Sequence, residues 1–223
     1  SKKLLEVPVY GTVNVHASLL PKYRGAAPIN WCILEGETVS GVTTMLTDPG
    51  IDTGDMLLSR QVEIGENETA GERLSHVGAE LLIETLEGYL KGEITPVKQD
   101  ESQMSHQPML DKEMGRIDWS RSAREIACQV RGLNPWPVAY TALEGKPLKI
   151  YQARPIEGAA EAVPGQVVES SAKKGLMVAC GQGVLELIEI QAPAAKRMQA
   201  KAYLMGKRIE PGTVLGKEEN QDA

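Results

Sequence analysis

The sequence predicts an α/β domain followed by a small OB-like β-barrel domain, and three observations support this prediction. Strand-like and helix-like stretches alternate over the first 100 residues, as they do in α/β proteins. The second half holds about five short strand-like stretches and one or two helices, which is the element content of a small Greek-key barrel. Between the halves, the polar residues 96–107 show neither the spacing of apolar residues that marks a helix nor the alternation that marks a strand. We therefore expect domains at 1–95 and 111–216, a linker at 96–110 and a polar tail at 217–223.

In the first half, residues 10–17 read as a short buried strand, and 40–48 and 55–64 as two further extended stretches. Residues 27–36 read as a helix, with Pro28 in its first turn and Gly36 as its stop. A second helix is expected to begin at the capping-box spacing Thr69-Ala-Gly-Glu72, to end by Gly92 and to cover a sheet. Its apolar face is predicted to hold Leu74, Val77, Leu81, Leu82, Leu86, Tyr89 and Leu90.

In the second half, residues 122–133 read as a helix that ends at Asn134-Pro135. The strand-like stretches follow it, separated by turns at Glu144-Gly145 and at 181–183. A last short helix is expected at 200–206. The predicted strands are 138–153, 165–170, 175–180 and 184–190, the first of which is divided by the Glu144-Gly145 turn.

The composition is that of an ordinary globular protein. The chain has 223 residues, of which 42% are hydrophobic and 24% charged, which is enough to form two packed domains. No apolar run approaches the roughly 18 residues that a spanning helix needs, and the N-terminus lacks a signal-peptide core. Cys32, Cys128 and Cys180 are far apart and odd in number, which disfavours a disulfide framework or a zinc site. We expect packed thiols in a reducing cytoplasm.

Charge is distributed unevenly along the chain. Residues 1–100 carry 8 Lys and Arg against 15 Asp and Glu, whereas residues 138–216 carry 10 against 7. A basic module beside an acidic one is a footprint of nucleic-acid binding, although many basic surfaces bind nothing. The candidates for phosphate contact, with a solvated face as the alternative, are Lys196, Arg197, Lys201, Lys207 and Arg208.

Asn14 and His16 are two residues apart in the first predicted strand, so their side chains point to the same face. Strand ends are where α/β folds hold ligands. An imidazole there could polarise or protonate a carbonyl oxygen, and an asparagine amide could donate a second hydrogen bond to the same developing oxyanion. The alternative is a satisfied core histidine beside a turn-forming asparagine. The spacing alone leaves both interpretations open.

The stretch "DPGIDTGD" places Asp48, Asp52 and Asp55 on a turn-rich loop after a strand. A solvated loop is one interpretation. A calcium loop is another, but the spacing of such loops is absent. The hypothesis that explains most is a single aspartate oriented against His16, which would hold the imidazole and accept a proton through water.

These residues carry a resemblance. Asn14-x-His16-x-Ser18-Leu19-Leu20-Pro21, followed by Tyr23-Arg24-Gly25-Ala-Ala-Pro28 and Asp52-Thr-Gly-Asp55, resembles the signature of the formyltetrahydrofolate-dependent formyltransferases. The later stretches "GRIDWSRSAREI…RGLNPWPVAYT" and "KRMQAKAYLMG…PGTVLG" are similar to the C-terminal region of the methionyl-tRNA formyltransferases within that family. The resemblance covers nearly the whole chain.

The resemblance implies a partial Rossmann-like formyltransferase domain with Asn14, His16 and Asp52 as catalytic residues. It implies that Ser18, Leu19, Leu20 and Pro21 form the turn against which a reduced folate sits. The formyl donor would be 10-formyltetrahydrofolate and the acceptor methionyl-initiator tRNA, without a metal, in a bacterial-type cytoplasm or an organelle. Arg24 would either steady an anionic group of the folate or RNA, or form a structural salt bridge. Asp55 is better explained as a turn cap.

The start of the chain is the main departure from the family pattern. A domain of parallel strands needs neighbours and coverage on both faces, so we expect that the N-terminal part of the catalytic domain is missing and is itself a partner of this chain. Two alternatives to the implied activity stay open. One is a related transferase or hydrolase that acts on another amine or on water, and the other is an inactive RNA-binding fragment.

Overall fold

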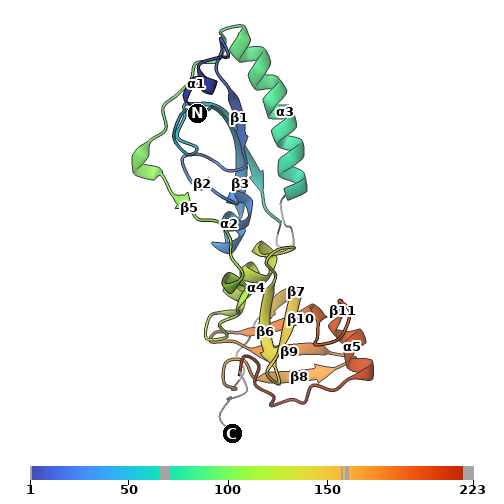
Figure 1. The fold of residues 1–223 in the computed structure, drawn as a ribbon. Helices are drawn as coiled ribbons and strands as arrows, with labels where there is room; N and C mark the ends of the chain where they lie inside the picture. Colours follow the sequence, from blue (N-terminus) through green and yellow to red (C-terminus); the bar gives the residue numbers. More distant parts are fainter. Residues whose placement is uncertain (1, 66–70, 157, 159–160, 218–223) are drawn as a thin grey trace. The chain divides into compact units, whose positions relative to one another are not determined.

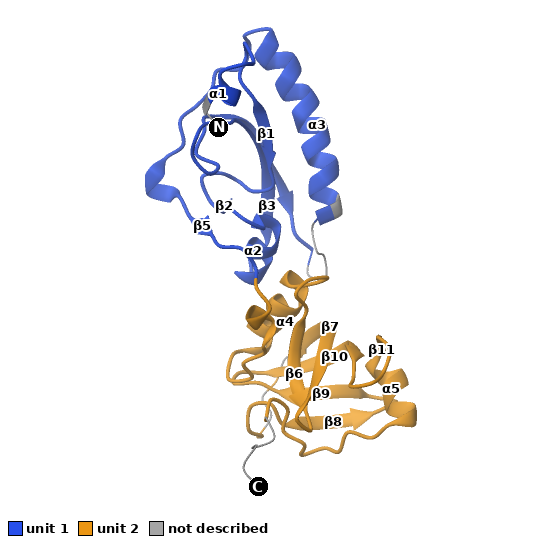
Figure 2. Ribbon diagram, in the orientation of Figure 1, with its two compact units in different colours: residues 1–110 blue, residues 111–223 orange. Residues whose placement is uncertain are grey.

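The chain forms two compact units, residues 1–110 and 111–223 (Figure 2). This computed structural model describes residues 2–65, 71–156, 158 and 161–217. The division lies at the end of the segment that the sequence predicts to be a linker. Each unit has its own cluster of buried apolar side chains, which is what two separately packed domains require.

Unit 1 contains a sheet, one long helix and several short elements (Figure 1). The two long extended stretches and the first helix expected from the sequence are confirmed. The first strand is shorter and more open than expected, because Val15 in its centre is 37% exposed. The elements are α1 (Lys2–Leu5), β1 (Val13–His16), β2 (Arg24–Gly25), α2 (Pro28–Leu34), β3 (Val39–Leu46), β4 (Met56–Glu63), α3 (Gly71–Leu90), the 3-10 turn Glu101–Gln103 and β5 (His106–Gln107).

The sheet has the order β1-β3-β4, and both of its strand pairs are antiparallel. The expectation of parallel strands is therefore wrong for these three. The β3 to β4 connection spans only residues 47–55, which is too short for the crossover that a parallel pair needs. Asn14 pairs with Met45 and His16 with Thr43, so these four residues share one face of the sheet.

The opposite face of the sheet is covered by α3, which lies alongside β1 and β3 in Figure 1. Leu74 and Leu81 are buried there, as the helical spacing predicts. Leu86 and Leu90 do not follow the prediction, because they are 39% and 55% exposed. The predicted capping box begins at Thr69, outside the described residues. Within the described part of the chain, no helix is long and apolar enough to cross a membrane.

The expected linker, residues 96–110, is bound to unit 1 along its length. Val97 exchanges two backbone hydrogen bonds with Met56, at 2.8 and 2.9 Å. Further along, β5 pairs in parallel with β2. We call residues 96–110 the connecting segment. It contains the 3-10 turn Glu101–Gln103, and it packs within unit 1 because its backbone completes hydrogen bonds that strand ends and turns leave open.

Unit 2 holds an antiparallel sheet with the order β6-β7-β10-β9-β8, to which β11 adds on β10. The predicted helices at 122–133 and 200–206 are confirmed, and Ser122 and Glu125 form a complete capping box. Glu144 and Gly145 both have positive φ, as a type I′ hairpin turn requires. The elements are the 3-10 turn Glu113–Gly115, α4 (Ala123–Gly132), β6 (Ala139–Leu143), β7 (Lys146–Ile156), β8 (Val167–Ser171), β9 (Gly175–Ala179), β10 (Val184–Gln191), β11 (Met198–Gln199) and α5 (Ala200–Gly206).

The sheet of unit 2 is not a closed barrel, because no strand pairing joins β6 to β8 among the described residues. Residues 212–216 lie between these two edges instead. Gly212 donates to the carbonyl of Val167 in β8, and Gly216 donates to Ala142 in β6, each at 2.8 Å. The backbone groups of both edges are thus partly satisfied by an irregular segment.

The three cysteines are buried thiols, as expected. Cys180 packs in the unit 2 core, and burial raises its pKa to about 11. Its thiol therefore stays protonated at neutral pH, which is the state of a packed side chain and not of a nucleophile.

Candidate active site

The site face of the β1-β3-β4 sheet is the face opposite α3. Val15 points toward α3, since it lines a pocket with Leu74 and Ala79 of that helix. Asn14 and His16 therefore point to the other side, where the sheet is met by the turn after β1 and by the loop 47–55. Two of the three predicted catalytic residues come close here, because Asp52 of that loop lies 3.6 Å from His16, and Asn14 shares the face of the sheet with His16.

His16 is buried, with one ring nitrogen hydrogen-bonded and the other close to Asp52. Its Nε2 lies 2.8 Å from the carbonyl oxygen of Tyr23, and a carbonyl can only accept, so Nε2 carries the hydrogen of this bond. Its Nδ1 lies 3.6 Å from Oδ2 of Asp52, an ion-pair distance longer than a hydrogen bond. The Tyr23 contact fixes the plane of the ring, and Nδ1 is left as the nitrogen that can serve a ligand.

Asp52 is fixed by its backbone and by its carboxylate. The amide of Gly25 donates to Oδ2 at 2.8 Å, so this oxygen has a donor besides His16. The φ of Asp52 is 55°, a left-handed conformation that few residues other than glycine adopt. Such strain persists only where surrounding contacts impose it. The side chain is 18% exposed, which leaves the carboxylate accessible.

Three polar groups on the site face lack a hydrogen-bond partner among the described residues. They are the side-chain amide of Asn14, Nδ1 of His16 and Oδ1 of Asp52. Asn14 is half-buried and His16 is 6% exposed, so neither is simply solvated. The Asn14 amide can donate, Oδ1 of Asp52 can accept, and Nδ1 of His16 can accept or, when the ring is protonated, donate. A ligand with a polar oxygen and a transferable proton would satisfy these groups.

The turn Ser18–Pro21 is built into the sheet. Ser18 is fully buried and its hydroxyl donates to the Lys22 carbonyl at 2.6 Å. Thr43 of β3 donates to the Ser18 carbonyl at 2.7 Å and accepts from the Leu20 amide at 3.1 Å. Ser18 and Leu20 therefore shape this turn from inside, and Leu19 and Pro21 are its partly exposed members.

The other two loop aspartates differ in role. Asp48 accepts hydrogen bonds from the Gly50 amide at 3.0 Å and from the Thr53 hydroxyl at 2.6 Å, so it is the cap of this loop. Asp55 was the expected turn cap, but the capping contacts belong to Asp48. Within residues 2–65, 71–156, 158 and 161–217, no cluster of three acidic, His or Cys side chains could hold a metal.

Arg24 is buried, and its guanidinium is bound by side chains of the connecting segment. It is 2% exposed and donates to both carboxylate oxygens of Glu101, at 2.8 and 3.1 Å, and to Gln99 at 2.9 Å. These bonds hold the pKa of Glu101 below its ordinary value. Of the two sequence interpretations, the geometry favours the structural salt bridge, because all three nitrogens of the guanidinium already donate hydrogen bonds.

Sequence reasoning missed the residues that fasten this site from the connecting segment. Gln99 is 8% exposed and donates to the carbonyls of Asp52 and Gly54, both at 2.8 Å. The Ser105 hydroxyl accepts from the Tyr23 amide at 2.8 Å. Both lie in a polar stretch without periodicity. The one signal that could have singled them out is the resemblance, had it been extended through this stretch.

Tyr23 anchors the residues that follow the turn. Its φ is 61°, and its one hydroxyl hydrogen is shared between the carboxylates of Glu35, at 2.7 Å, and Glu37, at 3.1 Å. Burial, followed by the Glu35 and Glu37 carboxylates, raises the pKa of Tyr23 well above its usual value. The hydroxyl therefore remains a donor at any physiological pH, and the Tyr23 carbonyl is held in place for His16.

On unit 2, the five predicted phosphate-binding residues are all exposed. Arg197 is already paired, with Glu189 at 2.6 Å, and its guanidinium lies 4.1 Å from the ring centre of Tyr151. Arg208 lies 3.3 Å from Glu210. Lys196, Lys201 and Lys207 have no ion pair among the described residues, which leaves their charges available.

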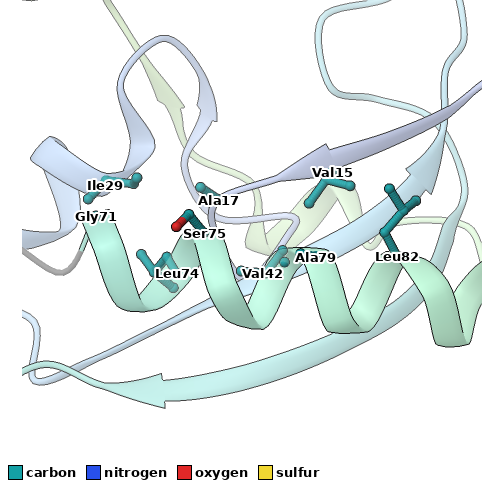
Figure 3. Close-up of a pocket in the computed structure, with 10 residues that line it drawn as sticks. Val15, Ala17, Ile29, Val42, Gly71, Leu74, Ser75, Ala79 and Leu82 are labelled. Carbon is teal, nitrogen blue, oxygen red and sulfur yellow. The ribbon is translucent and has the colours of Figure 1, made fainter.

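An apolar pocket of about 340 Å³ lies on the α3 side of the sheet (Figure 3). Val15 and Ala17 line it from β1 and the residue after it, and Leu74, Ala79 and Leu82 line it from α3. Its lining side chains are apolar apart from the hydroxyl of Ser75, and none of them is titratable. The pocket and the polar site are therefore separate features on opposite faces of one sheet.

Comparison with known proteins identifies the family. The profile of the formyl transferases matches residues 1–86, and that of the formyl transferase C-terminal domain matches 109–208. The chain is 50% identical over 217 residues to a methionyl-tRNA formyltransferase of Clostridium novyi, covering 96% of this chain and 70% of that protein. It belongs to the methionyl-tRNA formyltransferase family. The enzyme of that name from Citrifermentans bemidjiense is 49% identical over 98% of this chain and 69% of its own length.

Solved structures support the fold of a formyltransferase. HypX from Aquifex aeolicus, solved with tetrahydrofolic acid, aligns with 91% of this chain and 38% of its own, with a TM-score of 0.66 and 20% identity. The open groups on the site face have the chemistry that a formyl group would use, because an amide and a protonated imidazole can donate to a carbonyl oxygen and a carboxylate oxygen can accept a proton. The sequence-predicted residues Asn14, His16 and Asp52 thus contribute the open polar groups of this face.

Proposed function

We propose that this methionyl-tRNA formyltransferase family member transfers the formyl group of 10-formyltetrahydrofolate to the amino group of methionyl-initiator tRNA. The observation that carries this proposal is the 50% identity to an enzyme of that name over 96% of the chain. The folate supplies the activated formyl group as a substrate. We infer the acceptor, methionyl-initiator tRNA, from the similarity over both units. A similarity to the first unit alone would not distinguish this enzyme from other formyltransferases.

The proposed role of Asn14 and His16 is to stabilise negative charge on the formyl oxygen. Their side chains are on one face of β1, and the Asn14 amide and His16 Nδ1 are the open groups there. When Nδ1 is protonated, both groups can donate to the same oxygen as the amine attacks. Donors fixed before reaction contribute most, since they do not reorganise during it. The Tyr23 carbonyl provides this fixation for His16.

The proposed role of Asp52 is to receive the proton of the attacking amine, directly or through water. Oδ2 is held by the Gly25 amide and faces His16 at 3.6 Å, while Oδ1 is open. The same carboxylate balances the charge of a protonated imidazole. As the tetrahedral intermediate collapses, the bond between the formyl carbon and the folate nitrogen breaks, and this nitrogen takes up the proton that Asp52 received. Tetrahydrofolate then leaves, and no covalent bond to the enzyme is needed.

We propose that the reduced folate lies against the turn Ser18–Pro21. This is supported by the rigidity of the turn, which follows β1 directly and is fastened to Thr43 of β3. Leu19 and Pro21 are its accessible members and would contact the folate, whereas Ser18 and Leu20 would act by shaping the turn.

Unit 2 is proposed to be an OB-like module that binds the tRNA. Five antiparallel strands and the segment 212–216 between β6 and β8 support an OB-like arrangement. Exposed lysines at 196, 201 and 207 are the proposed phosphate contacts, in contrast to Arg197 and Arg208, which already have acidic partners.

We also propose that a segment preceding Ser1 completes unit 1. The relatives are longer than this chain, which covers about 70% of the Clostridium novyi protein. Within the described residues β1 pairs on one edge only, and Val15 beside that edge is 37% exposed above the apolar pocket. A strand and an apolar side chain from the preceding segment would satisfy both.

We propose that the protein acts in a bacterial-type cytoplasm, where charged initiator tRNA and reduced folate meet.

The experiment that tests the function is a formyl-transfer panel with the complete polypeptide. 10-Formyltetrahydrofolate is the donor, and the acceptors are methionyl-initiator tRNA, a nucleotide-linked amino sugar and water. The proposal predicts formyl-methionyl-tRNA as the main product. Faster transfer to the sugar or hydrolysis to formate would assign a related activity instead, and tRNA binding without any transfer would leave an RNA-binding protein.

A further inference from the structure

Gln99, in the connecting segment, has a hydrogen-bond arrangement that no proposed catalytic step uses. Its side chain is 8% exposed, and both of its polar atoms are engaged. Nε2 donates to the carbonyls of Asp52 and Gly54, each at 2.8 Å, and Oε1 accepts from Nε of Arg24 at 2.9 Å. An amide is the one neutral side-chain group that can donate twice and accept at the same place.

The two carbonyls that Gln99 holds determine where the Asp52 carboxylate lies. They flank Thr53, so they fix the backbone that directly follows the Cα of the strained Asp52. A left-handed aspartate returns readily to an ordinary conformation unless neighbours oppose it. Such a return would redirect its side chain away from His16.

The side-chain oxygen of Gln99 acts on the hydrogen bond between the Gly25 amide and the Asp52 carboxylate. Gln99 accepts from Arg24, and Arg24 is the residue before Gly25, whose amide holds Oδ2 of Asp52. Gly25 itself has a φ of 96°, and a Cβ there would come within 2.6 Å of the Gln107 carbonyl of the connecting segment. The Gln99 side chain thus links two sets of contacts that position Asp52. It binds the backbone carbonyls directly, and through Arg24 it supports Gly25, whose amide binds the carboxylate.

We propose that Gln99 is a positioning residue for formyl transfer, which keeps the Asp52 carboxylate against His16 by holding the Asp52–Gly54 backbone and Arg24 together. The inference rests on the proposed function. It accounts for a buried polar residue in a segment otherwise without pattern, and it gives the connecting segment a part in catalysis besides joining the units. Misplacement of a reacting group by about 1 Å costs on the order of 100-fold in rate.

The first test compares three substitutions in the complete polypeptide. Gln99→Leu removes all three hydrogen bonds, and Gln99→Glu keeps an acceptor for Arg24 but has no N–H for the two carbonyls. Gln103→Leu is the matched control, because Gln103 is an exposed glutamine of the same segment. We expect kcat to fall about 10- to 100-fold in both Gln99 variants, with KM for folate and tRNA changed by less than about threefold, and no change in the control.

Each variant is assayed well below its own unfolding midpoint, so that lost folding is not counted as lost catalysis. If Gln99→Glu keeps the wild-type kcat, the donation to the Asp52 loop is dispensable and the proposal is overturned. The same holds if Gln103→Leu is as slow as Gln99→Leu, since the effect would then belong to the segment as a whole. Should Gln99→Leu not fold, Gln99→Glu still decides.

The second test is a double-mutant cycle with Asp52→Asn. A residue that acts through Asp52 has little left to do once the carboxylate is gone, so the double variant should be no more than about twofold slower than Asp52→Asn alone. A purely structural Gln99 would give multiplied losses, and that result would overturn the proposal. Absence of formyl transfer in the wild-type protein would instead refute the proposed function, so the two failures are distinguishable.

Discussion

The two faces of the β1-β3-β4 sheet use alternate residues of the same strands in opposite ways. Toward α3, the described side chains are mainly apolar, and the buried hydroxyls of Thr44 and Thr85 lie 2.8 Å apart and satisfy each other. On the site face, the Asn14 amide, His16 Nδ1 and Asp52 Oδ1 remain open among the described residues. The buried hydroxyls on the α3 face are hydrogen-bonded to each other, whereas the polar groups on the site face remain available to a ligand.

The difference shows how stability and chemistry are separated within a strand of four residues. Val15 contributes to packing, and its neighbours Asn14 and His16 contribute to the site, because successive side chains of a strand point to opposite faces. The fold tolerates these unpaired polar groups because hydrogen bonds with Tyr23, Gly25 and Gln99 hold the rest of the site in place. Substitutions on the two faces should therefore have different consequences.

The largest effect is expected on the site face. His16→Ala in the complete polypeptide should lower kcat by about 10²–10⁴, as for other general acid–base groups, with little change in KM for the folate. The fold should survive, since the change removes one hydrogen bond to the Tyr23 carbonyl, worth about 1–3 kcal/mol. Steady-state kinetics with charged initiator tRNA check this. Wild-type turnover in the variant would remove His16 from the mechanism.

A smaller effect, of a different kind, is expected on the α3 face. Leu81 is 1% exposed, so Leu81→Ala should lower the free energy of unfolding by about 2–5 kcal/mol. The kcat of the folded fraction should stay near that of the wild type, because Leu81 packs on the face away from the site. Ile83→Ala is the matched control on the same helix, where Ile83 is 62% exposed. Denaturant unfolding and activity are measured on both variants, and a loss of kcat without a loss of stability would contradict the separation of the faces.

The smallest effect concerns charges outside both faces. Lys196→Ala and Lys201→Ala should each weaken tRNA binding several-fold and flatten its salt dependence by about 0.9 slope unit per lost phosphate contact. Neither should alter the transfer rate at saturating tRNA. Lys91→Ala, an exposed lysine of unit 1, removes the same charge as a control. Equal slopes for all four proteins would mean that these lysines form a solvated surface.

The sequence predicted the features of this molecule that depend on local spacing. Helical periodicity located α3 and its buried Leu74 and Leu81, and period-two spacing placed Asn14 and His16 on one face. Turn chemistry marked the loop of Asp52. The same rules failed for Leu86 and Leu90, which continue the helical spacing but are exposed, because spacing alone does not say where the covering element ends.

The remainder could not be predicted because it depends on contacts between distant residues. Gln99 meets Asp52 47 positions away and Arg24 75 positions away, and no local period encodes such pairs. Arg24 could have faced a ligand as well as Glu101, and only the fold brings that carboxylate to it. The antiparallel pairing of β1 with β3 is likewise a long-range choice that strand propensity leaves open.

The most direct test of the site-face account is single-turnover transfer of a labelled formyl group to methionyl-initiator tRNA by the complete wild-type polypeptide and by Asp52→Ala. Asp55→Ala, which removes a carboxylate from the same loop, is the control. The account predicts labelled formyl-methionyl-tRNA from the wild type and the control at similar rates, and a rate about 10²–10⁴ lower for Asp52→Ala with unchanged tRNA binding. Equal rates for the wild type and Asp52→Ala, or no labelled product from the wild type, would contradict it.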